Sequence, residues 1–355
     1  MIGDDFRDIE AEYIRRRDAS DDEGQGDLIP SEVAETPGIE HPMNTFRGRE
    51  EVIKVLRECT TEQLTYLNTL VIVLDSRLTL DLAFKTLLEN RIRCAPVFDY
   101  KCSKYVGVLS ISDLVDSLTY LRNALAAGSN VKGLHCLTIM SWREFTQRNI
   151  EDSWTAYINA DASLQETCHT LQDKRLHILP VLDRNSNQVV DILTHSRIFR
   201  FVYTRLQALQ GRHREWLEQL LDMTAFELGI GTYSNILTFN YSSSVASAVN
   251  AFFEKKISYL PIVDENGGLV DLYNRSEILQ YYFESLDLAM NITVHDAIHA
   301  HRKTRPHLPV CKKTSSLKEV FDIFRETRLH RVFFVDEMKR IVGVISLRDV
   351  FHAFL

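Results

Sequence analysis

The feature that most constrains the fold of this chain is an internal repeat. Four segments align with one another: residues 92–99 (IRCAPVFD), 176–183 (LHILPVLD), 257–264 (ISYLPIVD) and 329–336 (LHRVFFVD). The aspartates that close these segments are 84, 81 and 72 residues apart. Each segment is followed by a second apolar run and a polar stretch, at residues 106–113, 189–197, 269–277 and 342–349. The repeat predicts four copies of one supersecondary unit.

Each unit has the pattern strand, helix, strand, strand, helix. Apolar residues spaced three and four apart precede each hairpin, as at Leu80, Ala83, Phe84 and Leu87, and they predict an amphipathic helix. The apolar run 71–74 predicts a short strand before the first of these helices. A unit of about 60 residues cannot bury its own apolar sheet face, so we expect the units to pair. The predicted fold class is α+β.

The charge of the chain is unevenly distributed. Residues 1–45 contain 13 acidic residues and 4 arginines, whereas residues 46–355 contain 36 acidic and 37 basic residues. An acidic stretch with few aromatic residues is typical of a disordered tail, which we expect at 1–45. The rest of the chain is nearly neutral, which argues against nucleic-acid binding.

Targeting features are missing from the sequence. No run of about 18 apolar residues predicts a membrane span, and the acidic start of the chain does not match a secretory signal. The six cysteines form no CxxC pair, so we expect reduced thiols, no metal site, and a cytoplasmic or nuclear location. P-loop, protein-kinase and HExxH motifs are also missing, which argues against an enzyme.

A polar residue recurs at the start of the helix that closes each unit. Asp113 and Asp349 fill this place in units 1 and 4, Arg197 in unit 2 and Glu277 in unit 3. A carboxylate in the first turn normally caps free backbone N–H groups. It also offers two acceptor oxygens to a vicinal diol, whereas arginine offers none. Capping and ligand binding both remain open for these aspartates.

A second recurring position lies just before the first hairpin strand of each unit. Arg93, His177, Ser258 and His330 occupy it, and Arg331 follows in the last unit. Polar residues at strand starts are usually solvated. Cationic residues at the same position of several repeat units favour phosphate binding instead. The planar, permanently charged guanidinium of arginine matches the geometry of a phosphate.

The unit resembles the CBS motif, and two units in tandem resemble a Bateman module. Four units, together with residues 192–198 (ILTHSRI) and 230–236 (IGTYSNI), resemble the γ regulatory subunits of AMP-activated protein kinase. The resemblance implies CBS motifs at 60–122, 150–205, 230–285 and 292–355, paired as two Bateman modules in a pseudo-fourfold disk.

The resemblance also implies nucleotide-binding roles for particular residues. Two aspartates would accept the ribose hydroxyls, and the cationic residues would bind phosphates at the centre of the disk. The implied nucleotide-binding residues are Arg93, Ser110, Asp113, His177, Thr232, Asn235, Ser258, Glu277, Arg302, His330, Arg331, Ser346 and Asp349.

The chain departs from the family pattern at several of these places. Ile178 and Ser196 stand where the family has an arginine and a lysine, and Arg348 stands where it has a serine. Glu277 replaces an aspartate, whereas Arg197 matches the arginine of the family's empty second site. We therefore expect the chain to retain some nucleotide sites, with altered affinity or number.

The function implied by the resemblance is non-catalytic sensing of AMP, ADP and ATP. The partners would be a catalytic α kinase subunit and a β scaffold subunit. One alternative is a scaffold subunit that has lost its nucleotide response. The other is a fragment of a CBS-regulated enzyme or transporter, against which the missing barrel and membrane spans argue.

Overall fold

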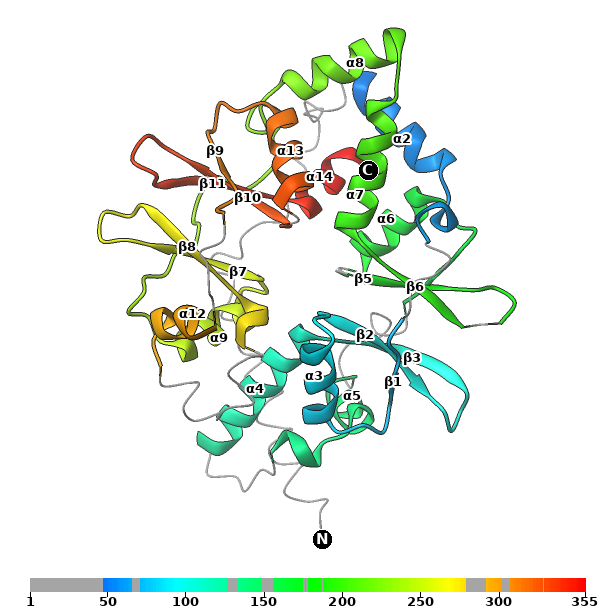
Figure 1. Cartoon of the computed structure of the whole chain (residues 1–355), viewed down its shortest axis with the longest axis vertical. Helices are drawn as coiled ribbons and strands as arrows, with labels where there is room; N and C mark the ends of the chain where they lie inside the picture. The colour runs from blue at the N-terminus through cyan, green and yellow to red at the C-terminus, as the bar shows by residue number, and fades with distance from the viewer. Residues whose placement is uncertain are drawn as a thin grey trace, which may run out of the picture.

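The computed structural model describes most of the chain. It covers residues 47–65, 71–126, 133–147, 156–174, 176, 178–186, 188–278, 292–301, 307–327 and 329–355. The predicted acidic tail lies outside these residues. In the described part, the helix and the two-stranded hairpin of the α+β unit inferred from the repeat are present in four copies, arranged around a ring (Figure 1).

The first two units show the complete pattern. Unit 1 consists of β1 (Leu74–Asp75), α3 (Leu80–Glu89), β2 (Cys94–Asp99), β3 (Lys104–Ser110) and α4 (Ile111–Ala126). Unit 2 consists of β4 (Ile158–Asn159), α6 (Leu164–Asp173), β5 (Ile178–Leu182), β6 (Val189–Thr194) and α7 (His195–Gln207).

Within the described residues, unit 3 shows part of this pattern, whereas unit 4 shows all of it. Unit 3 consists of α9 (Val245–Glu254), β7 (Tyr259–Val263), β8 (Leu269–Asn274) and the 3-10 turn η5 (Arg275–Glu277). Unit 4 consists of β9 (Val310–Cys311), α13 (Leu317–Thr327), β10 (Arg331–Val335), β11 (Ile341–Ser346) and α14 (Leu347–Phe354). In place of a first strand, the described part of unit 3 has an isolated parallel bridge between Phe239 and Ile262.

Each hairpin has the same pairing. The first hairpin strand pairs antiparallel with the second, and in units 1, 2 and 4 it also pairs parallel with the strand that precedes the helix. The register shifts at the same step of every hairpin, which confirms the structural repeat; the shifts fall at Val97/Phe98, Val181/Leu182, Ile262/Val263 and Phe334/Val335. The predicted amphipathic helices are confirmed too, since Leu80, Ala83, Phe84 and Leu87 are completely buried.

The segments that connect the units exchange partners within each pair. They comprise α2 (Arg47–Glu58), η3 (Thr61–Leu64), η4 (Leu134–Cys136), α5 (Ile139–Gln147), α8 (Gly211–Asp222) and α12 (Val294–His301). Residues 59–64 precede unit 1 but bond to unit 2, and residues 137–140 precede unit 2 but bond to unit 1. Residues 223–232 and 292–295 exchange between units 3 and 4 in the same way. The pairs 1–2 and 3–4 are therefore interlocked, as expected of two Bateman modules.

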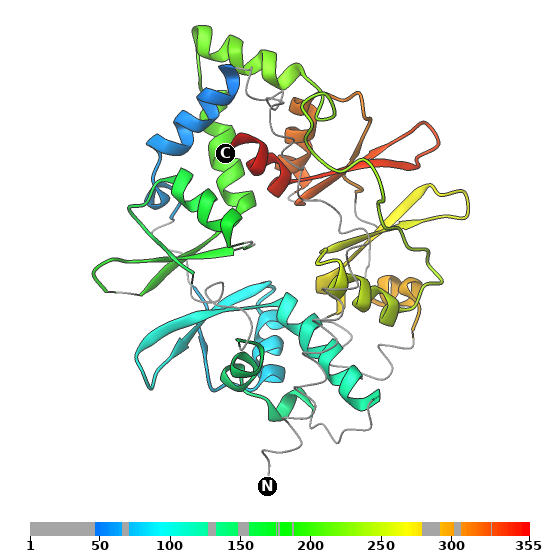
Figure 2. The ribbon, with the colours of Figure 1, turned by 180° about the vertical axis from the view of Figure 1, so that it is seen from behind.

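The two modules pack on each other through helices. The ring order is unit 1, unit 2, unit 4, unit 3, so that unit 2 adjoins unit 4 and unit 1 adjoins unit 3 (Figures 1 and 2). One large apolar core joins units 2 and 4 with α2 and α8, and a second joins units 1 and 3. The helix predicted near residues 215–221 is α8, which lies between the modules in the sequence.

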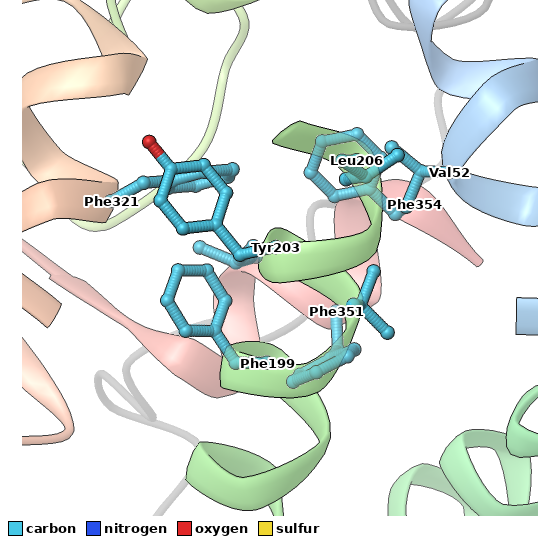
Figure 3. A pocket seen from close by; sticks show the side chains of 9 residues that line it. Val52, Phe199, Tyr203, Leu206, Phe321, Phe351 and Phe354 are labelled. Carbon is cyan, nitrogen blue, oxygen red and sulfur yellow. The ribbon is translucent and has the colours of Figure 1, made fainter. Parts of the chain in front are cut away.

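The contact between units 2 and 4 contains a small apolar cavity. Figure 3 shows it between α2, α7, α13 and α14. Its volume is about 20 Å³. The rings of Phe199 and Phe321 meet edge to face beside it, with centroids 5.1 Å apart. Its lining consists of Val52, Phe199, Val202, Tyr203, Leu206, Phe321, Val350, Phe351 and Phe354. Because this lining is apolar, we expect the cavity to be dry.

No helix in the described ranges combines the length and apolar character that a membrane crossing requires. The same ranges contain no cluster of three or more histidine, cysteine or carboxylate side chains arranged to hold a metal ion.

Candidate functional site

The helix starts of units 1 and 4 have the same geometry. The backbone N–H and the Oγ–H of Ser110 donate to Oδ2 of Asp113 over 2.7 and 2.8 Å. The corresponding distances from Ser346 to Oδ2 of Asp349 are also 2.7 and 2.8 Å. Both aspartates therefore cap their helices, as the capping interpretation predicted. These bonds fall on one oxygen of each carboxylate, and a carboxylate has capacity for further donors.

The two aspartates differ in their electrostatic surroundings. Asp113 is only 5% exposed, and this burial, together with the nearby Asp116 carboxylate, raises its pKa to about 7. The hydrogen bonds from Ser110 and the charge of Arg143 act against that increase. Asp349 is half-buried and faces the Arg331 guanidinium, whose pKa is lowered by burial and raised by this carboxylate.

Unit 2 uses its arginine internally. Arg197 forms an ion pair with the buried Asp191, with Nη1–Oδ1 and Nη2–Oδ2 distances of 2.6 and 2.8 Å. It also donates to the carbonyl oxygens of Ile192 and Leu64 over 2.7 and 2.8 Å. The position that holds a carboxylate in units 1 and 4 is thus occupied by a guanidinium engaged in four hydrogen bonds.

Unit 3 keeps a carboxylate, but on a longer side chain. The Asn274 N–H donates to Oε2 of Glu277 over 2.8 Å, and Oδ1 of Asn274 accepts from the Ser276 N–H over 3.0 Å. Glu277 therefore makes the same backbone cap as Asp113 and Asp349, with one additional methylene between the carboxylate and the backbone.

Several of the predicted phosphate-binding residues lie in one positive field. Burial, together with the charges of Arg93, Arg331 and Arg200, lowers the pKa of His330 to about 4. Burial also lowers the pKa of Arg275; Arg331 and Arg93 add to the effect, while Asp116 and Asp113 oppose it. These five side chains come from all four units, and we call them the inner cation cluster: Arg93, Arg200, Arg275, His330 and Arg331.

Repeated backbone bonds link this cluster to the helix starts. The carbonyl of Arg93 accepts from the Ile111 N–H, and that of His330 accepts from the Leu347 N–H, each over 3.0 Å. The Ser258 carbonyl accepts in the same way from the Arg275 N–H over 3.0 Å. The residue just before the first hairpin strand therefore lies beside the helix start of the same unit. The N-terminal ends of β2, β5, β7 and β10 point to the centre of the ring (Figure 1).

Sequence reasoning missed Arg200 and Arg275. Arg200 lies within α7 and shows no repeat signal. Arg275 follows β8 directly and precedes the aligned column of Glu277 by two residues. The position of Arg275 beside the capping residue could have identified it from the sequence. That Arg275 lies near Arg93 of unit 1, however, depends on closure of the ring.

The segment before unit 3 reaches unit 4. The N–H of Thr232 donates to the Val344 carbonyl, and the Val344 N–H donates back, both over 2.8 Å. Gly231 makes this approach possible: its φ is +106°, and a Cβ there would lie 2.8 Å from the Val344 oxygen. Asn235 is exposed and has a φ of 52°. Two predicted site residues, His177 and Arg302, lie outside the described residues.

The chain is similar to known proteins over most of its length. A family model described as the CBS domain matches residues 66–120, 144–204, 230–284 and 302–355. Human 5'-AMP-activated protein kinase subunit gamma-3 is 29% identical over 307 residues, which is 86% of this chain and 61% of that protein. The gamma subunit of Dictyostelium discoideum is 28% identical over 319 residues, 87% of this chain and 53% of that protein. The chain thus spans between half and two thirds of the length of these relatives.

A solved structure shares the fold. The crystal structure of a Methanocaldococcus jannaschii protein, described as an archaeal homologue candidate of the AMPK γ subunit, aligns with a TM-score of 0.65 at 16% identity. The alignment covers 84% of this chain and all of that one. With four matching segments that together span more than half of its residues, this γ-subunit-like chain belongs to the CBS-domain family.

Proposed function

We propose that the chain is a non-catalytic regulatory subunit that senses AMP, ADP and ATP in a kinase heterotrimer of the AMP-activated type. The observation that carries the proposal is the inner cation cluster beside the carboxylates of Asp113 and Asp349. Phosphates need several converging cations, and a ribose needs an acceptor pair. Similarity to the AMP-activated protein kinase γ subunits supports the same ligands.

The chemistry of binding follows from the charges. A phosphate that enters the cluster relieves the repulsion among Arg93, Arg275 and Arg331. It also favours protonation of His330, whose pKa is low because of burial and the surrounding arginines. His330 would therefore take up a proton when phosphate binds. The carboxylates of Asp113 and Asp349 would accept the ribose hydroxyls through the capacity left beyond their serine contacts.

We expect units 1 and 4 to hold the main sites. The Arg197 ion pair leaves no acceptor for ribose in unit 2. The longer side chain of Glu277 places the unit 3 carboxylate differently from an aspartate. Sensing requires that AMP and ATP bind two states of the assembled complex with different affinities, because equal affinity would shift no equilibrium.

Isothermal titration of the full chain with AMP, ADP and ATP tests this proposal. Asp113→Ala and Asp349→Ala should each remove one site. Asp296→Ala is the matched control, since Asp296 also accepts from its helix-capping residue, Thr293, over 2.7 Å, but lies on the exposed start of α12. Absence of binding at millimolar nucleotide would reject the proposal.

The partners need a separate experiment. Affinity capture of the full chain from cells should recover a kinase α subunit and a β subunit. Recovery of both without nucleotide binding would favour the scaffold alternative, which Ile178, Ser196 and Glu277 support. The cytoplasmic or nuclear location stays a prediction that the same tagged chain can test by microscopy.

A further inference from the structure

Helix α12 presents two histidines, one turn apart, to solvent. His295 and His299 are both exposed, while the helix is anchored by the buried Val294, Ala297 and Ile298. Residues four apart lie one above the other on a helix. The two imidazole rings are accordingly stacked, with centroids 4.2 Å apart and an angle of 21° between their planes. The exposed face of α12 therefore carries a ready-made pair of imidazoles.

The hydrogen bonds of the pair fix which nitrogen of each ring is protonated. Nδ1 of His299 lies 2.9 Å from the carbonyl oxygen of His295, and Nδ1 of His295 lies 3.3 Å from Oδ1 of Asp296. A carbonyl and a carboxylate oxygen only accept, so each Nδ1 donates and each neutral ring keeps its lone pair on Nε2. Within the described residues, neither Nε2 has a hydrogen-bond partner.

The surroundings hold both rings in place. The ring of Tyr241 meets the two imidazoles edge to face, with centroid distances of 5.4 and 5.9 Å. Its hydroxyl donates to Oδ2 of the buried Asp271 over 3.3 Å. The His295 N–H donates to the Tyr241 carbonyl over 3.0 Å, and the Val294 N–H donates to the Ser243 carbonyl over 2.8 Å. The start of α12 and the segment 241–243 thus form one support for the pair.

Two adjacent imidazole lone pairs are ligands for a divalent transition metal. Zinc, copper and nickel favour imidazole nitrogen, whereas magnesium and calcium favour oxygen. Histidines that bind a metal usually donate their other ring N–H to a carboxylate or a backbone carbonyl, which is the arrangement at both rings here. A tetrahedral Zn²⁺ with Zn–N bonds of about 2.1 Å needs the two Nε2 atoms about 3.4 Å apart. Rings stacked at 4.2 Å reach that separation by a small rotation of the side chains.

We infer that His295 and His299 form a two-histidine site for a divalent transition metal ion of the zinc type, with Nε2 of each ring as a ligand. Water would fill the other coordination positions, so the ion would exchange with solvent. The expectation of no metal site rested on the spacing of the cysteines, and this site contains none. It is also independent of the nucleotide sites, since neither histidine belongs to the inner cation cluster.

Calorimetric titration of the nucleotide-free full chain with ZnCl₂ tests the inference. His295→Gln and His299→Gln should each weaken Zn²⁺ binding about tenfold or more, because each removes one of two ligands. Titration of the wild-type chain with MgCl₂ should show no binding at the pair. No Zn²⁺ binding by the wild type at millimolar ion, or equal Zn²⁺ affinity of the wild type and the variant with both substitutions, would overturn the inference.

The matched control is His213→Gln on α8, which should leave Zn²⁺ affinity unchanged. The His213 side chain is 51% exposed, against 52% for His295, and its Nδ1 also lies near a carboxylate oxygen, Oε1 of Glu51, at 2.7 Å. Its neighbouring ring is that of Trp216 rather than a second imidazole. A loss of Zn²⁺ affinity in His213→Gln as large as in the α12 variants would indicate binding to any exposed histidine and contradict the site.

NMR of the ¹⁵N-histidine-labelled wild type identifies the ligand atoms without relying on a variant's stability. Zn²⁺ should move the Nε2 signals of His295 and His299 together, while their Nδ1 nitrogens stay protonated, and the glutamine variants assign these signals. Coordination through Nδ1, or movement of the His213 signals at the same Zn²⁺ concentration, would overturn the inference.

Discussion

Replacing Asp113 by asparagine should stabilise the ligand-free chain at neutral pH. Asp113 is almost fully buried, and burial next to Asp116 raises its pKa from 3.8 to about 7. Its carboxylate is therefore less stable in the folded chain than in the unfolded chain. Asparagine has a similar shape and an oxygen that can accept from Ser110, but it has no charge to desolvate.

The sign of the effect fixes its pH window. The folded pKa lies above the unfolded one, so the folded chain binds more protons than the unfolded chain between pH 3.8 and about 7. The free energy of unfolding of the wild type therefore falls as pH rises through this window, and the deficit is constant above it. The distance between the two pKa values corresponds to at most about 4 kcal/mol.

The assay is urea unfolding of nucleotide-free D113N and wild-type chains at several pH values between 4 and 8. The difference in stability should be near zero at pH 4 and grow to about 2–4 kcal/mol at pH 8, which is the burial cost of the carboxylate. Asp349→Asn is the matched control. Its half-buried carboxylate faces Arg331, so no such gain is expected. If D113N were no more stable than the wild type at pH 8, the burial argument would be wrong.

Substitutions at three further places in the structure have predictable effects. Val350→Ile should fill part of the 20 Å³ cavity and raise the free energy of unfolding by about 0.5 kcal/mol, whereas Phe354→Ala should lower it by about 3–5 kcal/mol. A lower free energy of unfolding in Val350→Ile would contradict the presence of this cavity. Arg197→Met should lower the free energy of unfolding in urea by about 3–5 kcal/mol, because it leaves the buried Asp191 carboxylate without its countercharge. Adding Asp191→Asn should recover most of that free energy. Equal stability of the single and double variants would refute this explanation. Arg275→Gln should weaken AMP binding about ten- to a hundredfold in a calorimetric titration, and unchanged affinity would remove Arg275 from the phosphate site.

The local structure of each unit could be predicted because its determinants are local. Apolar residues spaced as at Leu80, Phe84 and Leu87 fix which helix face is buried. The alternation of β2 and β3 around Pro96 and Gly107 fixes the hairpin register. The same pattern occurs four times, so an error in one copy would have been visible against the others.

The packing of connecting helices could not be predicted. Helices α5 and α12 have apolar faces that suit either neighbouring unit, and nothing in their sequences states which unit they cover. Each of these helices packs on the unit that precedes it in the sequence, because the chain must cross from one unit of the module to the other. The burial of Arg143 against unit 1 depends on that exchange, so sequence reasoning gave no signal for it.

The candidate site was predictable in part. The repeat step identified Arg93, His330 and Arg331, and the structure brings these three together. Arg200 and Arg275 join them only because ring closure sets α7 and η5 near the other units. The closure of the ring, and not the sequence of a single unit, determines which cations from different units lie near one another.

The central claim is that the inner cation cluster and its two aspartates bind adenine nucleotides. Calorimetric titration of the full chain with AMP tests it most directly. The account predicts about two sites, both lost in a chain that carries Asp113→Ala and Asp349→Ala, with affinity that falls as salt is added because charged contacts dominate. No heat of binding at millimolar AMP, or unchanged binding by the double variant, would contradict the account.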